Sequence, residues 1–229
     1  MIYYKQKKII FIGSNQNLLK ILGKENQTEV SSSVSFLQNL IENFTPDLII
    51  FDNVKTADIE AVRENEKLLS VPVLIVSSDF SELNNLSNIT IFPRTIICNE
   101  CVSCTQKFIE HLYKIMEHKK NILPSKTGAL VKYAILYMNK NLSGKIKRKT
   151  FSVQLGLSED YLTKIFKAEL GIGLWEYLNI FRLDKAKKLL IKTDLSVSKI
   201  SSMCGFESAS YFNKAFKKFY KANPLSFRL

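Results

Sequence analysis

The sequence lacks any long hydrophobic run. Its first apolar stretch, Ile9–Ile12, ends at Gly13-Ser14. A signal peptide needs a core of roughly 7–15 apolar residues and a membrane-spanning helix needs about 20. No N-terminal segment resembles either, so we expect a cytoplasmic protein without a membrane partner.

Cysteine is also scarce, with four residues in a chain of 229, and this excludes a disulfide scaffold. Cys98, Cys101 and Cys104 are spaced three residues apart, at the expected start of a helix. This spacing suits a soft metal or a redox sensor. The alternative is that they are small buried hydrophobic residues. Metal-binding cysteine pairs more often sit in turns, and no fourth ligand is evident, because His111 is two turns further on. We therefore expect no cofactor and no metal.

Acidic residues are few in the second half of the chain. Residues 119–229 hold 22 Lys/Arg and 7 Asp/Glu, a net charge of +15, whereas residues 1–118 hold 11 and 14, a net charge of −3. This asymmetry indicates a polyanionic partner for the basic half, bound through neutralised phosphates and released counterions. A lysine-rich solvated face would give the same charge.

The first half alternates short apolar runs with helical patterns, which predicts an α/β doubly wound domain over residues 1–118. Strands are expected at Lys8–Ile12, Asp47–Phe51 and Pro72–Val76, with weaker candidates at Thr28–Ser31 and Ile89–Phe92. Helices are expected at Gln16–Leu22, Val34–Phe44 and Glu100–His118. The strand pattern stops after these residues, and Pro124 interrupts any helix. We therefore predict that residues 119–126 form a linker.

The second half, residues 127–229, shows no strand alternation and predicts an all-α domain. Apolar residues at helical spacing, capping Ser and Asp residues and terminal glycines mark its helices. These are expected at Thr127–Asn141, Glu159–Leu170, Leu174–Ile191, Ser196–Met203 and Glu207–Tyr220, with a short one from Pro224.

Two segments of this half match the helix-turn-helix plan, in which a support helix and a sharp turn present a second helix to the major groove. The first is Phe151–Ser158 followed by Glu159–Lys167, and the second is Val197–Phe206 followed by Glu207–Lys218. A glycine marks each turn, and Leu157 or Phe206 follows it. An ordinary helical hairpin explains one copy more easily than two.

The stretch from about Lys126 to Arg228 resembles the AraC/XylS family of transcription regulators. The motifs that carry the resemblance include Gly156-Leu157-Ser158, Tyr161-Leu162, Phe166-Lys167, Leu170-Gly171, Arg182-Leu183, Lys185-Ala186, Leu189-Leu190, Ile200, Gly205-Phe206, Tyr211-Phe212, Phe216-Lys217, Pro224 and Phe227-Arg228. Ser152 and Ser201 stand where the family usually has Ala, and Lys221 where it often has Gly.

The resemblance implies that one chain places two recognition helices in successive major-groove segments of double-stranded DNA. Helical spacing and the family pattern put these residues toward base edges: Asp160, Thr163, Lys164, Ser208, Ala209, Asn213 and Lys214. Asn can read adenine and Lys can donate to guanine. Phosphate contacts are expected from Lys167, Tyr211, Lys217 and Lys218, which position the protein without specifying sequence. For each lysine the alternative is a solvated helix face. Apolar Leu162, Phe166, Trp175, Phe206, Phe212 and Phe216 are expected in the core.

Residues 7–118 resemble the receiver domain of response regulators. Pro46–Asp52 resembles its third strand, ending in the phospho-acceptor Asp52, and Pro72–Ser77 resembles its fourth. The acidic pair that would hold Mg²⁺ is missing, because Gly13-Ser14 follows the first strand, and Phe92-Pro93 stands in place of Lys-Pro. Phosphorylation of Asp52 is therefore an alternative to a receiver-shaped module for dimerisation or signal binding.

The resulting prediction is a sequence-specific transcription regulator and not an enzyme. Family tendency implies an activator with RNA polymerase as a partner and a homodimer through the N-terminal domain. The same helical domain also occurs fused to a Cys-based DNA alkylation-repair enzyme, but this sequence has no Pro-Cys-His motif. A non-specific architectural protein is a third class, which the polar set Thr163, Asn213 and Lys214 argues against.

Overall fold

The computed structural model describes residues 6–53, 56–78, 80, 94–117, 125–142, 146 and 148–228. By their internal contacts these residues form two compact units. The first unit is Met1–Leu136 with Ile165–Ile172, and the second is Tyr137–Lys164 with Gly173–Leu229.

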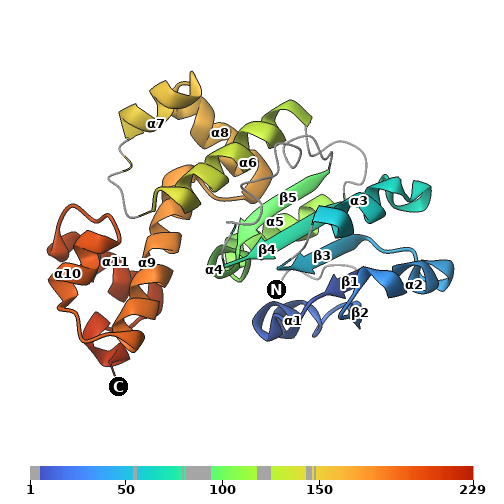
Figure 1. Cartoon of the computed structure of the whole chain (residues 1–229), viewed down its shortest axis with the longest axis horizontal. Helices are drawn as coiled ribbons and strands as arrows, with labels where there is room; N and C mark the ends of the chain where they lie inside the picture. The colour runs from blue at the N-terminus through green and yellow to red at the C-terminus, as the bar shows by residue number, and fades with distance from the viewer. Residues whose placement is uncertain are drawn as a thin grey trace. The chain divides into compact units, whose positions relative to one another are not determined.

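A five-stranded parallel sheet forms the centre of the N-terminal region (Figure 1). Its strands are β1 Lys8–Ile12, β2 Gln27–Ser31, β3 Leu48–Asp52, β4 Val73–Ser77 and β5 Thr95–Asn99. The order β2-β1-β3-β4-β5 is that of a flavodoxin-like doubly wound sheet. Strands β4 and β5 are buried along their whole length, as expected for parallel strands covered on both faces, although β5 is an edge strand of the sheet. The predicted α/β doubly wound fold agrees with this architecture.

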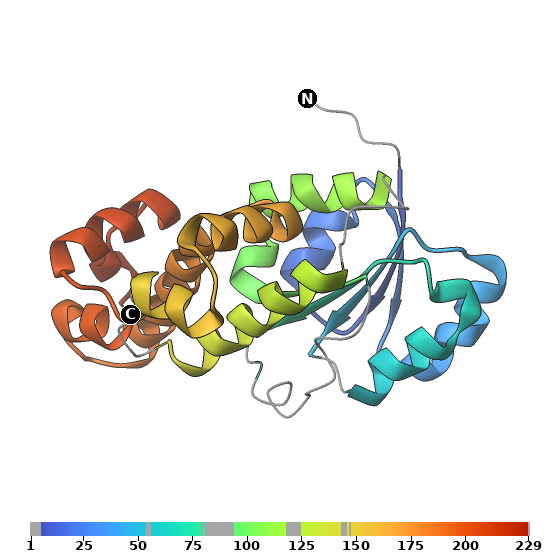
Figure 2. The same cartoon turned by 90° about the horizontal axis from the view of Figure 1, so that it is seen from above.

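Helices cover both faces of this sheet. They are α1 Gln16–Leu22, α2 Leu37–Asn43, α3 Thr56–Glu64, α4 Glu100–Ser103 and α5 Gln106–Glu117, with 3₁₀ turns η1 Val34–Phe36 and η2 Glu66–Leu68. Helices α1 and α5 lie on one face, and α2 and α3 on the other (Figure 2). Tyr113 of α5 accepts a hydrogen bond of 2.7 Å from Asn26 Nδ2, just before β2. Because β1 and β3 are parallel neighbours, their carboxyl ends lie at the same edge of the sheet.

The predicted helix Glu100–His118 starts at the residue where α4 begins, but the prediction places Cys98 wrongly and misses a break in the helix. The buried run Thr95–Asn99 before it is strand β5, so Cys98 lies in a strand and not in a helix. Asn99 then caps α4 by accepting the Cys101 N–H at 3.1 Å. The helix also breaks after Ser103, where the Thr105 hydroxyl donates to the Val102 carbonyl and α5 starts afresh. The weak strand at Ile89–Phe92, the Phe92-Pro93 pair and residues 119–124 of the linker lie outside the described residues.

From residue 125 onward, all regular elements among the described residues are helices, as predicted. They are α6 Ser125–Lys140, α7 Arg148–Leu155, α8 Glu159–Leu170, α9 Leu174–Lys192, α10 Val197–Met203 and α11 Ala209–Tyr220, followed by the 3₁₀ turn η4 Pro224–Phe227. Helix α6 begins within the expected linker. Helix α11 begins two residues after the expected Glu207, because Ser208 is its N-cap.

An aromatic core holds α9, α10 and α11 together. Its buried members are Leu183, Ala186, Leu190, Ile200, Cys204, Phe206, Phe212 and Phe216. The rings of Phe206 and Phe212 lie 5.1 Å apart, and those of Phe212 and Phe216 5.4 Å. Of the residues predicted for the core, only Trp175 is half-buried; its ring meets Phe151 edge-on at 6.4 Å. Within the described part of the chain, no helix combines the length and apolar character needed to span a bilayer.

Candidate nucleic-acid interface

The two predicted helix-turn-helix segments share one backbone turn. After α7, Gly156 N–H donates to the Val153 carbonyl at 3.1 Å and Leu157 N–H to the Ser152 carbonyl at 3.0 Å. After α10, Gly205 and Phe206 repeat both bonds toward Ser202 and Ser201, at 2.9 and 3.0 Å. This is the Schellman arrangement, which requires a left-handed residue. Both glycines supply it, with φ of +63° and +79°.

The serines that replace alanine in the support helices do not disturb these turns. Ser201 is buried, and its hydroxyl donates to the Ser198 carbonyl at 2.8 Å. Ser152 is buried as well. A serine hydroxyl bonded back to the preceding helical turn satisfies its own polarity, so it can occupy a small buried position.

A serine also caps each second helix. Ser158 Oγ accepts the Tyr161 N–H, and Ser208 Oγ accepts the Tyr211 N–H, both at 3.2 Å. Such caps satisfy one of the free N–H groups at a helix start. Counting from each serine aligns Thr163 with Asn213, Lys164 with Lys214 and Lys167 with Lys217.

Most residues predicted to contact bases have exposed side chains. The exposed ones are Asp160 and Lys164 on α8, the cap residue Ser208, and Asn213 and Lys214 on α11. Thr163 and Ala209 are half-buried; the Thr163 methyl lies 3.6 Å from where a side chain at Gly173 would begin. The opposite sides of both helices carry the buried residues Leu162, Phe166, Phe212 and Phe216. Each of these helices therefore has a polar side that is exposed to solvent and an opposite apolar side that is buried.

The predicted phosphate-contacting residues are exposed too. Lys167, Lys217 and Lys218 lie in the last turns of α8 and α11. Tyr211 is 52% exposed, and its hydroxyl accepts a hydrogen bond of 3.2 Å from Asn179 Nδ2 of α9. This bond fixes the phenol against the helix that joins the two motifs.

Sequence reasoning gave no role to Arg182 of α9, although it stands in one of the family motifs. Its side chain is only 9% exposed, and Nε and Nη2 have no hydrogen-bond partner within the described residues. Burial lowers the pKa of its guanidinium, and the neighbouring Cys204, Glu207 and Tyr211 oppose that shift. A single arginine among the apolar residues of α9 was the signal available in the sequence.

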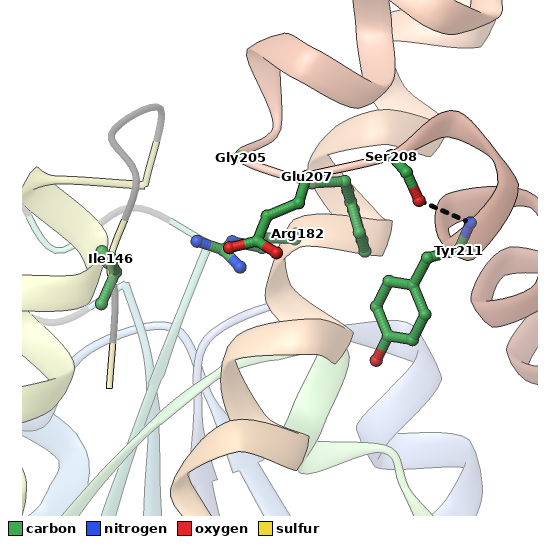
Figure 3. A pocket seen from close by; sticks show the side chains of 7 residues that line it. Ile146, Arg182, Gly205, Glu207, Ser208 and Tyr211 are labelled. Carbon is green, nitrogen blue, oxygen red and sulfur yellow. Dashed lines mark hydrogen bonds between the residues drawn. The ribbon is translucent and has the colours of Figure 1, made fainter. Parts of the chain in front are cut away.

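Arg182 lines a pocket of about 280 Å³ together with Ile146 and with residues of the second helix-turn-helix: Gly205, Phe206, Glu207, Ser208 and Tyr211. In the view of Figure 3 the Arg182 guanidinium and the Glu207 carboxylate overlap, and Ser208 and Tyr211 are joined by the capping hydrogen bond. The pocket therefore combines a buried cation with the start of a recognition helix.

At the sheet edge, Asp52 is held by its neighbours. Its Oδ2 accepts the Ser14 N–H at 3.2 Å, and a side chain at Gly13 would meet Asp52 Cβ at 2.5 Å. Ser77 Oγ donates to Asn53 Oδ1 at 2.9 Å. Gly13 and Ser14 lie beside Asp52 and supply no carboxylate for Mg²⁺.

The cysteine cluster is divided between β5 and α4. Cys98 is fully buried, whereas Cys101 and Cys104 are half-buried. Burial raises the pKa of the Cys98 and Cys104 thiols, which disfavours the thiolates that metal and redox chemistry need. No group of three potential metal ligands is present among the described residues. A metal or redox role for the cluster, the alternative raised by the cysteine spacing, has no structural support among the described residues.

Comparisons with known proteins match the C-terminal region. A helix-turn-helix domain model matches residues 151–229. The Xylose operon regulatory protein of Escherichia coli (strain K12) is 32% identical over 123 residues, which are 54% of this chain and 31% of that protein. Regulatory protein PocR of Salmonella typhimurium is 31% identical over 105 residues, 46% of this chain and 35% of PocR. The chain thus spans about a third of the length of these curated relatives.

A solved structure, the C-terminal domain of the two-component response regulator yesN from Fusobacterium nucleatum, is 34% identical with a TM-score of 0.39. The similarity covers 44% of this chain and 95% of that domain.

Proposed function

We propose, from the premise that residues 151–229 form an AraC-type helix-turn-helix domain, that this protein binds specific DNA sequences and regulates transcription. The observation that carries the proposal is the repeated turn. In both copies it presents a helix whose exposed side is polar and whose opposite side packs in an apolar core. The +15 net charge of residues 119–229 supports a polyanionic partner for the same region.

In this proposal, base readout comes from equivalent positions on the two recognition helices. Asn213 reads adenine and Lys214 donates to guanine, while Thr163 and Lys164 contact bases from α8. Asp160, Ser208 and Ala209 lie at the N-terminal ends that enter the groove first. Lys167, Lys217, Lys218 and Tyr211 bind phosphates and set the register.

Genome-wide footprinting tests this function directly. The expected result is a set of bound sites upstream of genes, sharing one motif with two half-sites about one helical turn apart. Titration of the purified chain should give an affinity for that motif roughly 10³-fold or more above that for a scrambled duplex. Equal affinity for both duplexes would instead indicate a non-specific architectural protein.

For the N-terminal region we propose a receiver-like module that acts without phosphorylation of Asp52. The strand order and the position of Asp52 at the end of β3 support the resemblance. The Ser14 N–H on Asp52 and the lack of carboxylates at Gly13-Ser14 support inactivity. Acetyl phosphate with Mg²⁺ should leave Asp52 unmodified while it labels a working receiver in parallel. Stoichiometric labelling that is lost in Asp52→Asn would contradict the proposal.

The output of this module is proposed to be transcriptional activation by a homodimer that contacts RNA polymerase. The family tendency supports activation, and the receiver-like region supports dimerisation or signal input. Deleting the gene should lower transcription from footprinted promoters, and sedimentation of the full chain should show twice the monomer mass. Raised transcription in the deletion strain would identify a repressor instead.

A further inference from the structure

We propose that Arg182 and the first turn of α11 form a binding site for a phosphate group of the DNA backbone. The site lies in the second helix-turn-helix, in the pocket that Figure 3 shows. The inference rests on the proposed function and adds an anchoring residue that lies on α9, outside both recognition helices.

The Arg182 side chain is buried and only partly paired within the described residues. A buried guanidinium costs free energy unless its N–H groups are paired, yet Nε and Nη2 lack partners within the described residues. The side chain lines the pocket shown in Figure 3. Arginine presents a planar fork of donors that suits a phosphate with two acceptor oxygens.

Helix α11 has 12 residues and begins at the pocket, directly after the lining residue Ser208. The Tyr211 N–H is used by Ser208 Oγ, and the Phe212 N–H by the Ser208 carbonyl at 3.0 Å. Ser208 and Tyr211 of this first turn line the pocket, and the helix dipole favours an anion at this end. The helix start and the buried cation thus favour the same ligand charge from independent elements.

Among the described residues that line the pocket, Glu207 is the one acidic residue. Its side chain is exposed, and its charge stabilises that of Arg182. A phosphate in the pocket would take over this stabilisation while being repelled by the carboxylate. Replacing Glu207 with a neutral residue should therefore strengthen phosphate binding in the pocket. Replacing Arg182 with a neutral residue should weaken it.

The site belongs to DNA rather than to a free anion because of its position. Its lining includes Ser208, which is predicted to enter the major groove, and Tyr211, which is predicted to contact phosphate. A backbone phosphate beside the groove that receives the start of α11 is therefore within reach. Inorganic phosphate has the same chemistry and serves as the comparison ligand.

The test measures binding of the full-length protein to cognate and scrambled duplexes across a salt series. Arg182→Gln should weaken binding about 10-fold or more on both duplexes, because phosphate contacts carry no sequence information. It should also reduce the slope of log K against log salt by about 0.9. Arg182→Lys should keep the slope, and Glu207→Gln should tighten binding. Lys20→Gln, an exposed lysine of α1, is the matched charge control and should change neither affinity nor slope.

Methylphosphonate substitution separates contact from structure. One neutral linkage at the phosphate in the pocket should weaken wild-type binding and leave Arg182→Gln unaffected, while neutral linkages elsewhere weaken both proteins equally. An unchanged salt slope in Arg182→Gln, or equal sensitivity at every linkage, would overturn the site even if thermal unfolding shows the variant to be destabilised. Stabilisation of free wild-type protein by inorganic phosphate at constant ionic strength, with no sensitive linkage, would assign the pocket to a free anion and also overturn the proposal. A wild-type protein that binds no duplex would instead refute the proposed function.

Discussion

A buried pair of opposite charges, Glu169 of α8 and Lys132 of α6, should make the stability of the first helix-turn-helix depend on pH. The two side chains are 3% and 2% exposed. Burial raises the pKa of Glu169 to about 7, against the attraction of Lys132. Burial likewise lowers the pKa of Lys132 to about 8, opposed by Glu169 and assisted by Arg63. We consider replacement of this acid by its neutral isostere, Glu169→Gln.

The sign follows from the protons that each state binds. With an ordinary pKa of 4.5 when unfolded and about 7 when folded, Glu169 holds its proton more tightly in the folded state. Its contribution to the free energy of unfolding is complete below pH 4.5 and is lost as the pH rises through 7. A shift of this size corresponds to about 3 kcal/mol at ~1.4 kcal/mol per unit. Because Lys132 returns part of that loss, we expect a change of roughly 1–3 kcal/mol.

Urea unfolding of wild type and Glu169→Gln at a series of pH values measures this difference. Far-UV circular dichroism reports the helices, and Trp175 is the only tryptophan in the sequence and gives a local signal. The free energy of unfolding of wild type, relative to the variant, should fall between pH 4.5 and 7.5. Two parallel curves across that range would refute the account of Glu169 as a buried acid with a raised pKa.

Two further substitutions test the recognition helix and its end. Lys214→Ala should weaken specific binding by about 1–3 kcal/mol and relax preference at one base pair, whereas Lys217→Ala should weaken binding equally on all duplexes; equal losses for Lys214→Ala on cognate and scrambled DNA in a titration would contradict base readout there. Lys221→Gly should raise the free energy of unfolding by about 0.5–1 kcal/mol, because Lys221 has φ of +59° and glycine avoids the left-handed cost but gains freedom when unfolded; thermal denaturation would show a lower melting temperature if this reasoning fails.

The helical periods and turn residues of the second half were readable from sequence because each is locally encoded. Helix α8 follows a capping serine and ends before a glycine, so both of its bounds could be predicted. Strand β5 was missed because Thr95–Asn99 runs straight into the cap of α4, with no turn residue between them. Periodicity alone does not separate such a short buried run from the helix that follows it.

The reading positions on α8 and α11 could be predicted, since they follow from helical spacing and the family pattern. The pocket around Arg182 could not, because it depends on tertiary packing. Residue 182 meets residues 205–211 only after α10 has folded back on α9. The sequence shows an arginine at a position where helical spacing predicts an apolar residue. It does not show which N–H groups of that arginine the fold leaves without partners.

The repeated turn has a consequence for how the binding site on DNA can change. Its hydrogen bonds use only backbone atoms, and its special conformation needs only Gly156 and Gly205. Thr163 and Asn213, or Lys164 and Lys214, are therefore free to differ without altering the scaffold that presents them. Because both helices belong to one chain, no two-fold symmetry ties their sequences together. We expect the DNA segment read by one chain to have two halves that are unrelated in sequence, read in a fixed direction and open to separate mutation.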